Sequence, residues 1–321
     1  MLAAMTAFEP LVVRRVPIDA AEAAEALAIA IQAWPTSERA GQLAAIAQLF
    51  ADGRADDFVL VVAHSESQPC GAVLAQILVG RAAVVWPPQL MSWRPATAAS
   101  ELLDEVHQQL ADADIHLAQA LLQYATDDAA QTFRSAGYEH AGDLLYMSAE
   151  AESFPSEQPR LEFHLESSSP ANHARLIRLL DATYRGSLDC PLVDGLRDTA
   201  DVLAGYRAVG QFRPELWLLA HGDGRDVACL LLADHPTQDQ FEIVYVGVVP
   251  ECRGRGWGLA LTRHAQWLAR QAGKSRVVLA VDAANAPAIA AYGAAGFVAW
   301  DRRSILVRSF RPAAKQAGAS T

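Results

Sequence analysis

The clearest pattern along the chain is a run of strand-forming residues that leads through a glycine-rich turn into a helical segment. Residues 241–249 are rich in β-branched and aromatic side chains, and residues 259–271 have the spacing of a helix. Between them, residues 253–258 read Arg-Gly-Arg-Gly-Trp-Gly. Glycines permit a tight turn, and a helix N-terminus offers unpaired N–H groups at the positive end of the helix dipole. The pattern therefore predicts an anion-binding loop, with two arginines able to pair with phosphate oxygens.

The same order of expected elements occurs twice. Each half reads as strand, helix, antiparallel strands, helix, strand, helix and strand. This order predicts two α+β domains, each an α/β/α sandwich with helices on a central mixed, mostly antiparallel sheet. The expected domains cover residues 1–150 and 161–311. Residues 151–160 have a linker composition, and residues 312–321 read as a flexible tail.

The two halves differ at the position of the glycine-rich loop. The first half has Pro87–Pro95 there, with no glycine and three prolines. Prolines lack the N–H groups that an anion would need. We therefore expect the first half to keep the fold without a phosphate loop.

Composition limits the class of protein. The 321 residues are 52% hydrophobic and 20% charged, which is typical of a soluble globular protein. No segment reads as a membrane span or a secretion signal, and a formal net charge of −11 argues against a nucleic-acid partner. The cysteines show no CxxC or zinc spacing, so we expect reduced thiols, no metal site and a cytoplasmic protein. They are Cys70, Cys190, Cys229 and Cys252.

A family resemblance emerges from the loop together with residues further along the chain. Val248-Val249-Pro250 followed by residues 253–258 fits an R-x-x-G-x-G loop, and Asn285, Tyr292 and Gly296-Phe297 follow it as an N…Y…GF signature. With these residues, the second half resembles the GCN5-related N-acetyltransferase (GNAT) superfamily. The resemblance is weaker over the first half. Two such domains, the first one degenerate, are similar to the tandem architecture of mycothiol synthase and related bacterial proteins.

The resemblance implies acetyl-CoA as cosubstrate, without a metal. Backbone amides of the loop would hold the pyrophosphate. The Val248 N–H would polarise the thioester carbonyl, and Asn285 would hydrogen-bond the pantetheine arm. The implied cofactor-binding residues are Val248, Val249, Arg253, Gly254, Arg255, Gly256, Trp257, Gly258 and Asn285.

Two residues match the catalytic groups of the family. Glu242 would take the proton of the ammonium, and alternation along the strand would place it on one face with Val244 and Val246. The alternative is a solvent-facing glutamate at the start of a strand. Tyr292 would protonate the departing thiolate, and the alternative is an aromatic that only packs. The first half has Phe133 at the corresponding place, and phenylalanine cannot donate a proton.

The acceptor region is expected after the first helix of the second half. Tyr184 and Asp189 lie in a polar segment there, and Asp189 would bind an ammonium or act as a turn residue. The sequence thus predicts an N-acetyltransferase that works by direct attack on acetyl-CoA in a ternary complex. An acyl-CoA-binding sensor without turnover and a scaffold are the alternatives. We expect a monomer, with a dimer still possible, and the acceptor amine stays open.

Overall fold

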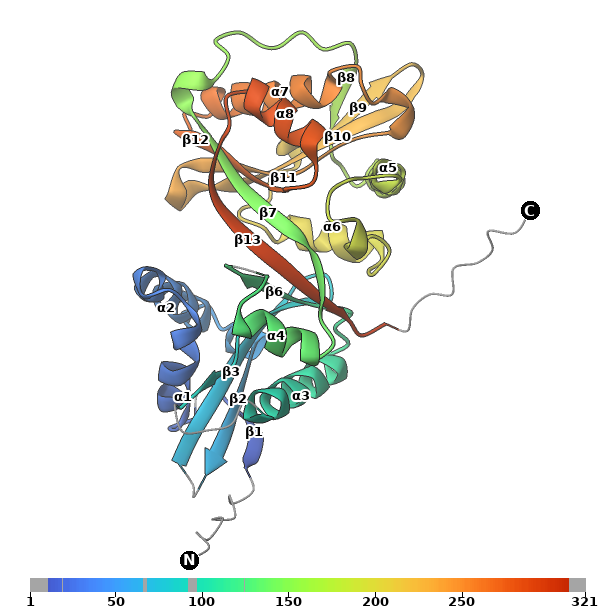
Figure 1. Ribbon diagram of the computed structural model, residues 1–321. Coiled ribbons are helices and arrows are strands. Elements are labelled where there is room, and N and C mark those ends of the chain that lie inside the picture. The colour runs from blue at the N-terminus through green and yellow to red at the C-terminus, as the bar shows by residue number, and fades with distance from the viewer. Residues whose placement is uncertain (1–10, 19, 66–67, 92–96, 124, 312–321) are drawn as a thin grey trace, which may run out of the picture. The chain divides into compact units, whose positions relative to one another are not determined.

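The computed structural model describes residues 11–18, 20–65, 68–91, 97–123 and 125–311. The chain divides into two compact units (Figure 1). The first combines residues 1–140 with 306–321, and the second is residues 141–305.

The first unit is a sheet whose strands follow the order β1-β2-β3-β4-β6, with β5 paired to β3. Only the β4–β6 pair is parallel in this part of the sheet. Its buried core combines strand residues with residues of α3 and α4 on one side, and with residues of α1 on the other. Its elements are β1 (Val12–Val16), α1 (Ala23–Ala30), α2 (Thr36–Ala51), β2 (Phe58–Ser65), β3 (Gln68–Leu78), β4 (Ala82–Val85), β5 (Gln89–Leu90), α3 (Thr97–Asp112), β6 (Leu117–Leu122) and α4 (Asp128–Ser135).

The second unit has the strand order β7-β12-β11-β10-β9-β8. Only the β11–β12 pair is parallel among the pairs from β7 to β8. Helices α7 and α8 lie together on one side of this sheet, and α5 and α6 lie on the other (Figure 1). Its elements are β7 (Glu139–Glu150), β8 (His164–Ser167), α5 (His173–Tyr184), α6 (Thr199–Arg207), β9 (Trp217–Gly222), β10 (Arg225–His235), β11 (Gln240–Val248), α7 (Trp257–Gln271), β12 (Arg276–Asp282), α8 (Ala286–Ala294) and β13 (Val298–Ser309).

The limits of the two units differ from the expected domain bounds. Strand β7 was expected to close the first domain, yet its residues 144–150 pair with β12 of the second unit. Leu306, near the end of β13, belongs instead to the core of the first unit. A strand pattern shows which residues alternate but not which sheet edge they join, so the sequence did not show that β7 pairs with β12 or that the end of β13 packs in the core of the first unit. Residues 151–153 of the expected linker form a short 3₁₀ helix, and the expected tail lies outside the described residues.

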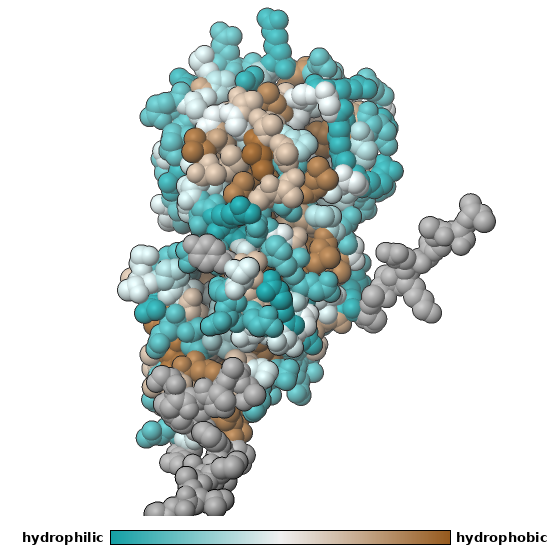
Figure 2. Space-filling model, viewed as in Figure 1, coloured by the Kyte–Doolittle hydropathy of each residue, from teal (hydrophilic) through white to brown (hydrophobic). Residues whose placement is uncertain are grey.

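The surface is mostly hydrophilic on the face seen in Figure 2, with a hydrophobic area on the second unit. Helix α8 reads Ala-Pro-Ala-Ile-Ala-Ala-Tyr-Gly-Ala, and Tyr292 is its buried residue.

Within the described ranges, no helix is long and apolar enough to cross a membrane. In the same residues no group of three or more His, Cys, Asp or Glu is placed to hold a metal ion. The four cysteines are buried and form no disulfide.

Candidate active site

The central feature of the second unit is an opening between two parallel strands. Strands β11 and β12 pair only from Gln240↔Arg276 to Ile243↔Leu279 in the described chain, although they continue to Val248 and Asp282. A cavity of about 220 Å³ lies at this opening. Strand edges that diverge leave N–H and C=O groups without a β partner, so a ligand with amide groups can pair with them.

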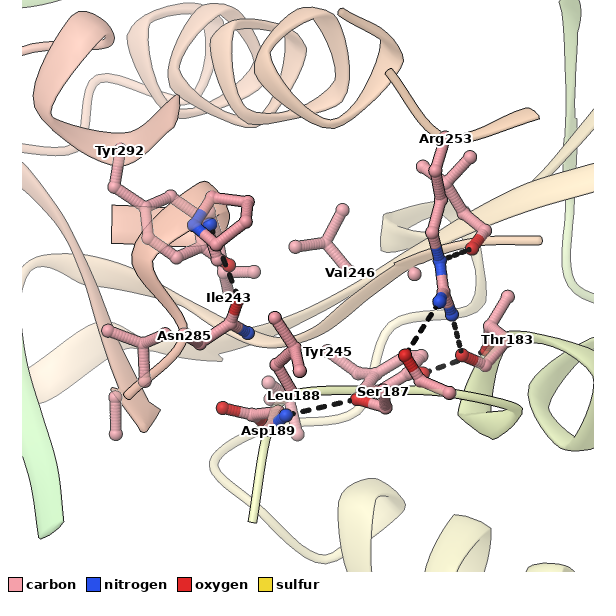
Figure 3. A pocket seen from close by; sticks show the side chains of 18 residues that line it. Thr183, Ser187, Leu188, Asp189, Ile243, Tyr245, Val246, Arg253, Asn285 and Tyr292 are labelled. Atoms are coloured by element: carbon pink, nitrogen blue, oxygen red, sulfur yellow. Dashed lines mark hydrogen bonds between the residues drawn. The ribbon is translucent and has the colours of Figure 1, made fainter. Parts of the chain in front are cut away.

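Residues from several segments line this cavity (Figure 3). Tyr292 and Asn285 lie at one end, Thr183 and Arg253 lie at the other, and Val246 lies between them. The remaining wall comes from β11, β12, α8 and the segment 185–190, which we call the acceptor loop. Its lining residues are Thr183, Gly186, Ser187, Leu188, Asp189, Ile243, Val244, Tyr245, Val246, Gly247, Val248, Arg253, Ala280, Val281, Asn285, Pro287, Ala288 and Tyr292.

A β-bulge in β11 changes which side chains share a face. Leu231 pairs with Tyr245 but Leu232 pairs with Ile243, so Val244 is an extra residue in β11. Because side chains alternate along β10, Tyr245 and Ile243 point to opposite faces. Glu242 therefore shares a face with Tyr245, and Val246 points to the other face. The expected alignment of Glu242 with Val246 was wrong, because a bulge leaves no mark in the hydrophobic pattern.

The glycine-rich loop has the backbone of an anion site. Gly254 and Gly256 have φ values of +79° and +77°, which side-chain-bearing residues adopt only with strain. Gly256 is the N-cap of α7, and no side chain caps this helix end. A Cβ atom built on Gly258 would meet nothing within 4 Å. The first amides of α7 thus face open space at the positive end of the helix.

The two arginines of the loop have different partners. Arg253 donates to backbone carbonyls, among them those of Thr183 and Gly186, each at 2.8 Å. Arg255 forms an exposed ion pair with Asp223 at 3.1 Å and lies over the Trp257 ring. Arg253 thus donates four of its five N–H groups to backbone carbonyls of the protein. That either guanidinium group adds charge to a phosphate site stays a prediction.

The end of β11 separates the expected roles of its last residues. The Val249 N–H donates to Val227 O on β10 at 2.9 Å, and its side chain is buried. Because successive amides of a strand point to opposite edges, the Val248 N–H points to the opening. Val248 lines the cavity and Val249 does not. Trp257 is also buried, with its indole N–H bonded to Glu162, so its backbone amide is the group left for a ligand.

Tyr292 and Asn285 come from α8. Tyr292 is 8% exposed, lies 5.8 Å from the Phe297 ring between centroids, and lines the cavity. Burial, with a smaller contribution from Asp189, raises the pKa of its hydroxyl well above the ordinary value. The group is therefore protonated at neutral pH. Asn285 is the N-cap of α8, and its side-chain oxygen accepts from the Ala288 N–H at 3.3 Å.

Glu242 lies just outside the lining of the cavity. Its carboxylate contacts His235 Nε2 at 2.8 Å, and its side chain is 31% exposed. On the same sheet face, Val278 pairs with Glu242, and Ala280 lies two residues further along β12 and lines the cavity. Glu242 is thus near the opening but held by a histidine that the sequence did not connect to it.

The acceptor loop is anchored by Asp189. Its Oδ1 accepts from the Asp282 N–H at 2.8 Å, and its own N–H donates to Ser187 Oγ. Although much of the Asp189 residue surface is exposed, the carboxyl group itself is enclosed by protein atoms, and this desolvation raises its pKa. These contacts are those of a structural anchor at the cavity wall. The predicted ammonium role has no separate support from them.

Tyr184 points into a cluster of tyrosines. Its hydroxyl lies 3.2 Å from that of Tyr206, and its ring makes an edge contact with Tyr245. Burial raises the pKa of Tyr184 far above its ordinary value. Tyr184 does not belong to the lining of the cavity, so it supports the wall formed by Tyr245.

The described residues of the first unit differ from this site at the corresponding places. Phe133 is fully buried and packs against Tyr138. Gln89 and Leu90 form β5, which pairs with β3. A Cβ on Gly71 of β3 would lie 2.5 Å from Leu90, so the two strands are in direct contact there. Residues 92–96 of the Pro87–Pro95 segment lie outside the described residues. That this segment binds no pyrophosphate stays a prediction.

Comparison with known proteins agrees with this geometry. Residues 180–297 match the model of the Acetyltransferase (GNAT) family. The second unit contains a GNAT domain. The match begins in the last turns of α5 and ends at Phe297, so it includes the opening, the glycine-rich loop and α8.

Curated relatives match over part of the chain. A mycothiol acetyltransferase of Paenarthrobacter aurescens is 38% identical over 104 residues, and one of Arthrobacter sp. is 43% identical over 108 residues. The aligned stretches cover 31% and 32% of this chain. They span only about a third of each relative, 32% and 33%.

Solved structures show the GNAT fold along nearly the whole chain. A GCN5-related N-acetyltransferase from Sphaerobacter thermophilus has a TM-score of 0.58 at 18% identity, covering 94% of this chain and 96% of that one. A tandem GNAT protein from the clavulanic acid biosynthesis pathway has a TM-score of 0.53 at 13% identity, covering 95% and 100%. The expected tandem GNAT fold is therefore confirmed. At these identities the likeness concerns the fold alone.

Proposed function

We propose that the second unit transfers an acetyl group from acetyl-CoA to a primary amine by direct attack in a ternary complex. The observation that carries this proposal is the opening between β11 and β12. It runs beside an uncapped helix N-terminus and is lined by Tyr292 and the acceptor loop. The GNAT match over the same residues supports it.

The residues present fit acetyl-CoA. The open amides of α7 suit a pyrophosphate, and Gly258 leaves room for its close approach. The free edge of β11, between Val244 and Val248, suits the amides of a pantetheine arm. The cavity is small compared with an entire CoA, so it suits the thioester end of the ligand. Bound there, acetyl-CoA supplies an acyl group activated as a thioester.

The protein groups have separate tasks in the transfer. The N–C bond forms while the C–S bond breaks, so the nitrogen loses a proton and the sulfur gains one. The Val248 N–H donates to the carbonyl oxygen as negative charge develops on it. Tyr292, protonated because it is buried, donates to the departing sulfur. Glu242 accepts the ammonium proton directly or through water, and His235 orients its carboxylate.

The acceptor approaches on the face that carries Tyr245 and the acceptor loop. The relatives are mycothiol acetyltransferases, so an amine of the mycothiol type is the first acceptor to assay. The aligned stretches cover only about a third of this chain and of each relative, so the assay should include unrelated amines.

The decisive measurement is release of free CoA thiol, followed with a thiol reagent, from acetyl-CoA and a panel of amines. We expect amine-dependent release that falls about 100-fold in the Tyr292→Phe variant. The second candidate is an acyl-CoA-binding sensor without turnover, favoured by the His235 contact that holds Glu242. Calorimetric binding of acetyl-CoA with no thiol release from any amine would support the sensor and reject the transferase.

A further inference from the structure

The Arg253 side chain ends among backbone carbonyls instead of in the open loop (Figure 3). Its Nε donates to Val248 O at 3.1 Å, and its Nη1 donates to Gly186 O at 2.8 Å. Its Nη2 donates to Thr183 O at 2.8 Å and to Arg185 O at 2.9 Å. One guanidinium group therefore joins the end of β11, the last turn of α5 and the acceptor loop.

An arginine suits this position for two reasons. The last carbonyls of α5 have no partner within the helix and lie at its negative end, where a cation is favourable. The guanidinium group also has five N–H donors in a planar arrangement, so it can bond four carbonyls at once. A lysine has the same charge but only a single donor atom.

The neighbouring packing fixes the same junction. A Cβ atom on Gly247 would lie 2.8 Å from Thr183, so β11 and the end of α5 are in direct contact there. The Thr183 hydroxyl also bonds the Tyr245 hydroxyl at 2.8 Å. Arg253 thus acts where α5 meets the strand that carries the Val248 N–H.

The acceptor loop is held at both ends. Arg253 bonds its first residues, and at the other end Asp189 accepts from the Asp282 N–H. Between these anchors, Ser187 and Leu188 line the cavity, and Leu188 is 52% exposed. Loss of the first anchor would free the residues that border the acceptor.

We propose that Arg253 is a positioning residue for the acceptor loop and the Val248 peptide, and does not bind the pyrophosphate. The inference rests on the proposed function, and it gives the first residue of the R-x-x-G-x-G loop a task on the acceptor side. The loop's second arginine offers the contrast. Arg255 carries the same charge two residues away, but in its ion pair with Asp223 both side chains are about half exposed, at 47% and 60%.

The test compares Arg253→Lys, Arg253→Gln and Arg255→Gln. In both Arg253 variants we expect kcat/KM for the amine to fall about 30-fold or more, because several hydrogen bonds to a charged group are lost. We expect the Kd of CoA to stay within about threefold, because the amides of α7 are unchanged. In Arg255→Gln we expect the reverse: weaker CoA binding with a shallower salt dependence and an unchanged KM for the amine.

Two further measurements keep the proposal testable if a variant folds poorly or if no amine is turned over. Gly186→Ala alters the acceptor loop at φ +62°, with a Cβ 3.6 Å from Arg253 Nη1, and should reproduce the amine effect with the guanidinium intact. Tryptic cleavage after Arg185, read by mass spectrometry, should be faster in Arg253→Lys than in the unaltered protein.

The proposal is overturned if Arg253→Lys behaves like the unaltered protein while Arg253→Gln loses CoA affinity with a shallower salt dependence. That pattern would show that Arg253 acts through its charge and not through the geometry of its hydrogen bonds. If the proposed function fails but the role of Arg253 is right, the results differ from this pattern. No amine would then release thiol, yet Arg253→Lys would still be cleaved faster after Arg185 and Arg255→Gln would still bind CoA more weakly.

Discussion

Gly258 allows the charge preference of the glycine-rich loop to be separated from its folding. It is the second residue of α7, its φ is not positive, and a Cβ there would meet nothing within 4 Å. Gly258→Asp therefore fits without a clash. A carboxylate in the first turn of a helix stabilises it by about 0.3–1 kcal/mol. The free energy of unfolding should stay the same or rise slightly.

The same carboxylate should repel a pyrophosphate. Two unit charges about 5 Å apart interact by about 3 kcal/mol at an effective dielectric constant of about 20. Exposure to salt at physiological strength reduces this to roughly 1–2 kcal/mol. We therefore expect CoA to bind about 5- to 30-fold more weakly. The matched control is Gly258→Asn, which has nearly the same shape without the charge and should change the affinity by about threefold or less.

The assay is calorimetric titration with CoA at two salt concentrations, beside thermal unfolding of each variant. The Asp effect should shrink at high salt, whereas the Asn effect should not. Equal weakening by Asp and Asn would mean that size decides. A stable Gly258→Asp variant with unchanged affinity at low salt would show that no anion binds at this helix end.

Three further predictions address other groups. Tyr292→Phe should lower kcat about 100-fold with a nearly unchanged KM for acetyl-CoA, since the ring keeps its contact with Phe297; an unchanged kcat in thiol release would leave Tyr292 a packing residue only. Glu242→Gln should slow the reaction at neutral pH and recover as the pH approaches the pKa of the amine, because a free amine needs no base; a constant ratio across the pH profile would contradict this. Burial, with a smaller contribution from Arg308, lowers the pKa of His107 from 6.5 to about 3. Between these pH values the His107 side chain is therefore less protonated in the folded protein than in the unfolded chain. Its stabilising contribution is complete above pH 6.5 and declines as the pH falls towards 3, by up to about 1.4 kcal/mol per pH unit, and His107→Gln should flatten the pH dependence of urea unfolding in that window.

Much of the fold was predictable because the repeated order of elements is written in the hydrophobic pattern. The strand expected at 241–249 and the helix expected at 259–271 appear as β11 and α7. The pairing of β7 with β12 and the packing of Leu306 in the core of the first unit were not predictable, because alternation along a strand does not show which neighbour the strand joins. Helices α2 and α6 were also missed.

Within the candidate site, the sequence was most informative about features that depend on the backbone conformation. A glycine with φ near +77° and an uncapped helix start follow from the residue types of the loop. Side-chain partners on neighbouring strands could not be read in this way. The bond from His235 to Glu242 depends on the register of the β10–β11 hairpin, and that register shifts at Val244.

Arg253 shows why a motif residue cannot be assigned from its charge. In the sequence, Arg253 and Arg255 are equivalent cations beside glycines that suit a phosphate. In the structure, the carbonyls at and just after the end of α5 accept three hydrogen bonds from Arg253, and Val248 O accepts a fourth. Arg255 pairs instead with Asp223. The C-terminus of α5, at Thr183 and 70 residues earlier in the chain, thus binds the Arg253 guanidinium group in place of a phosphate. The same physical property, a helix end lacking hydrogen-bond partners, thus operates twice in one site: the start of α7 is left open for an anion, and the end of α5 is closed by an arginine.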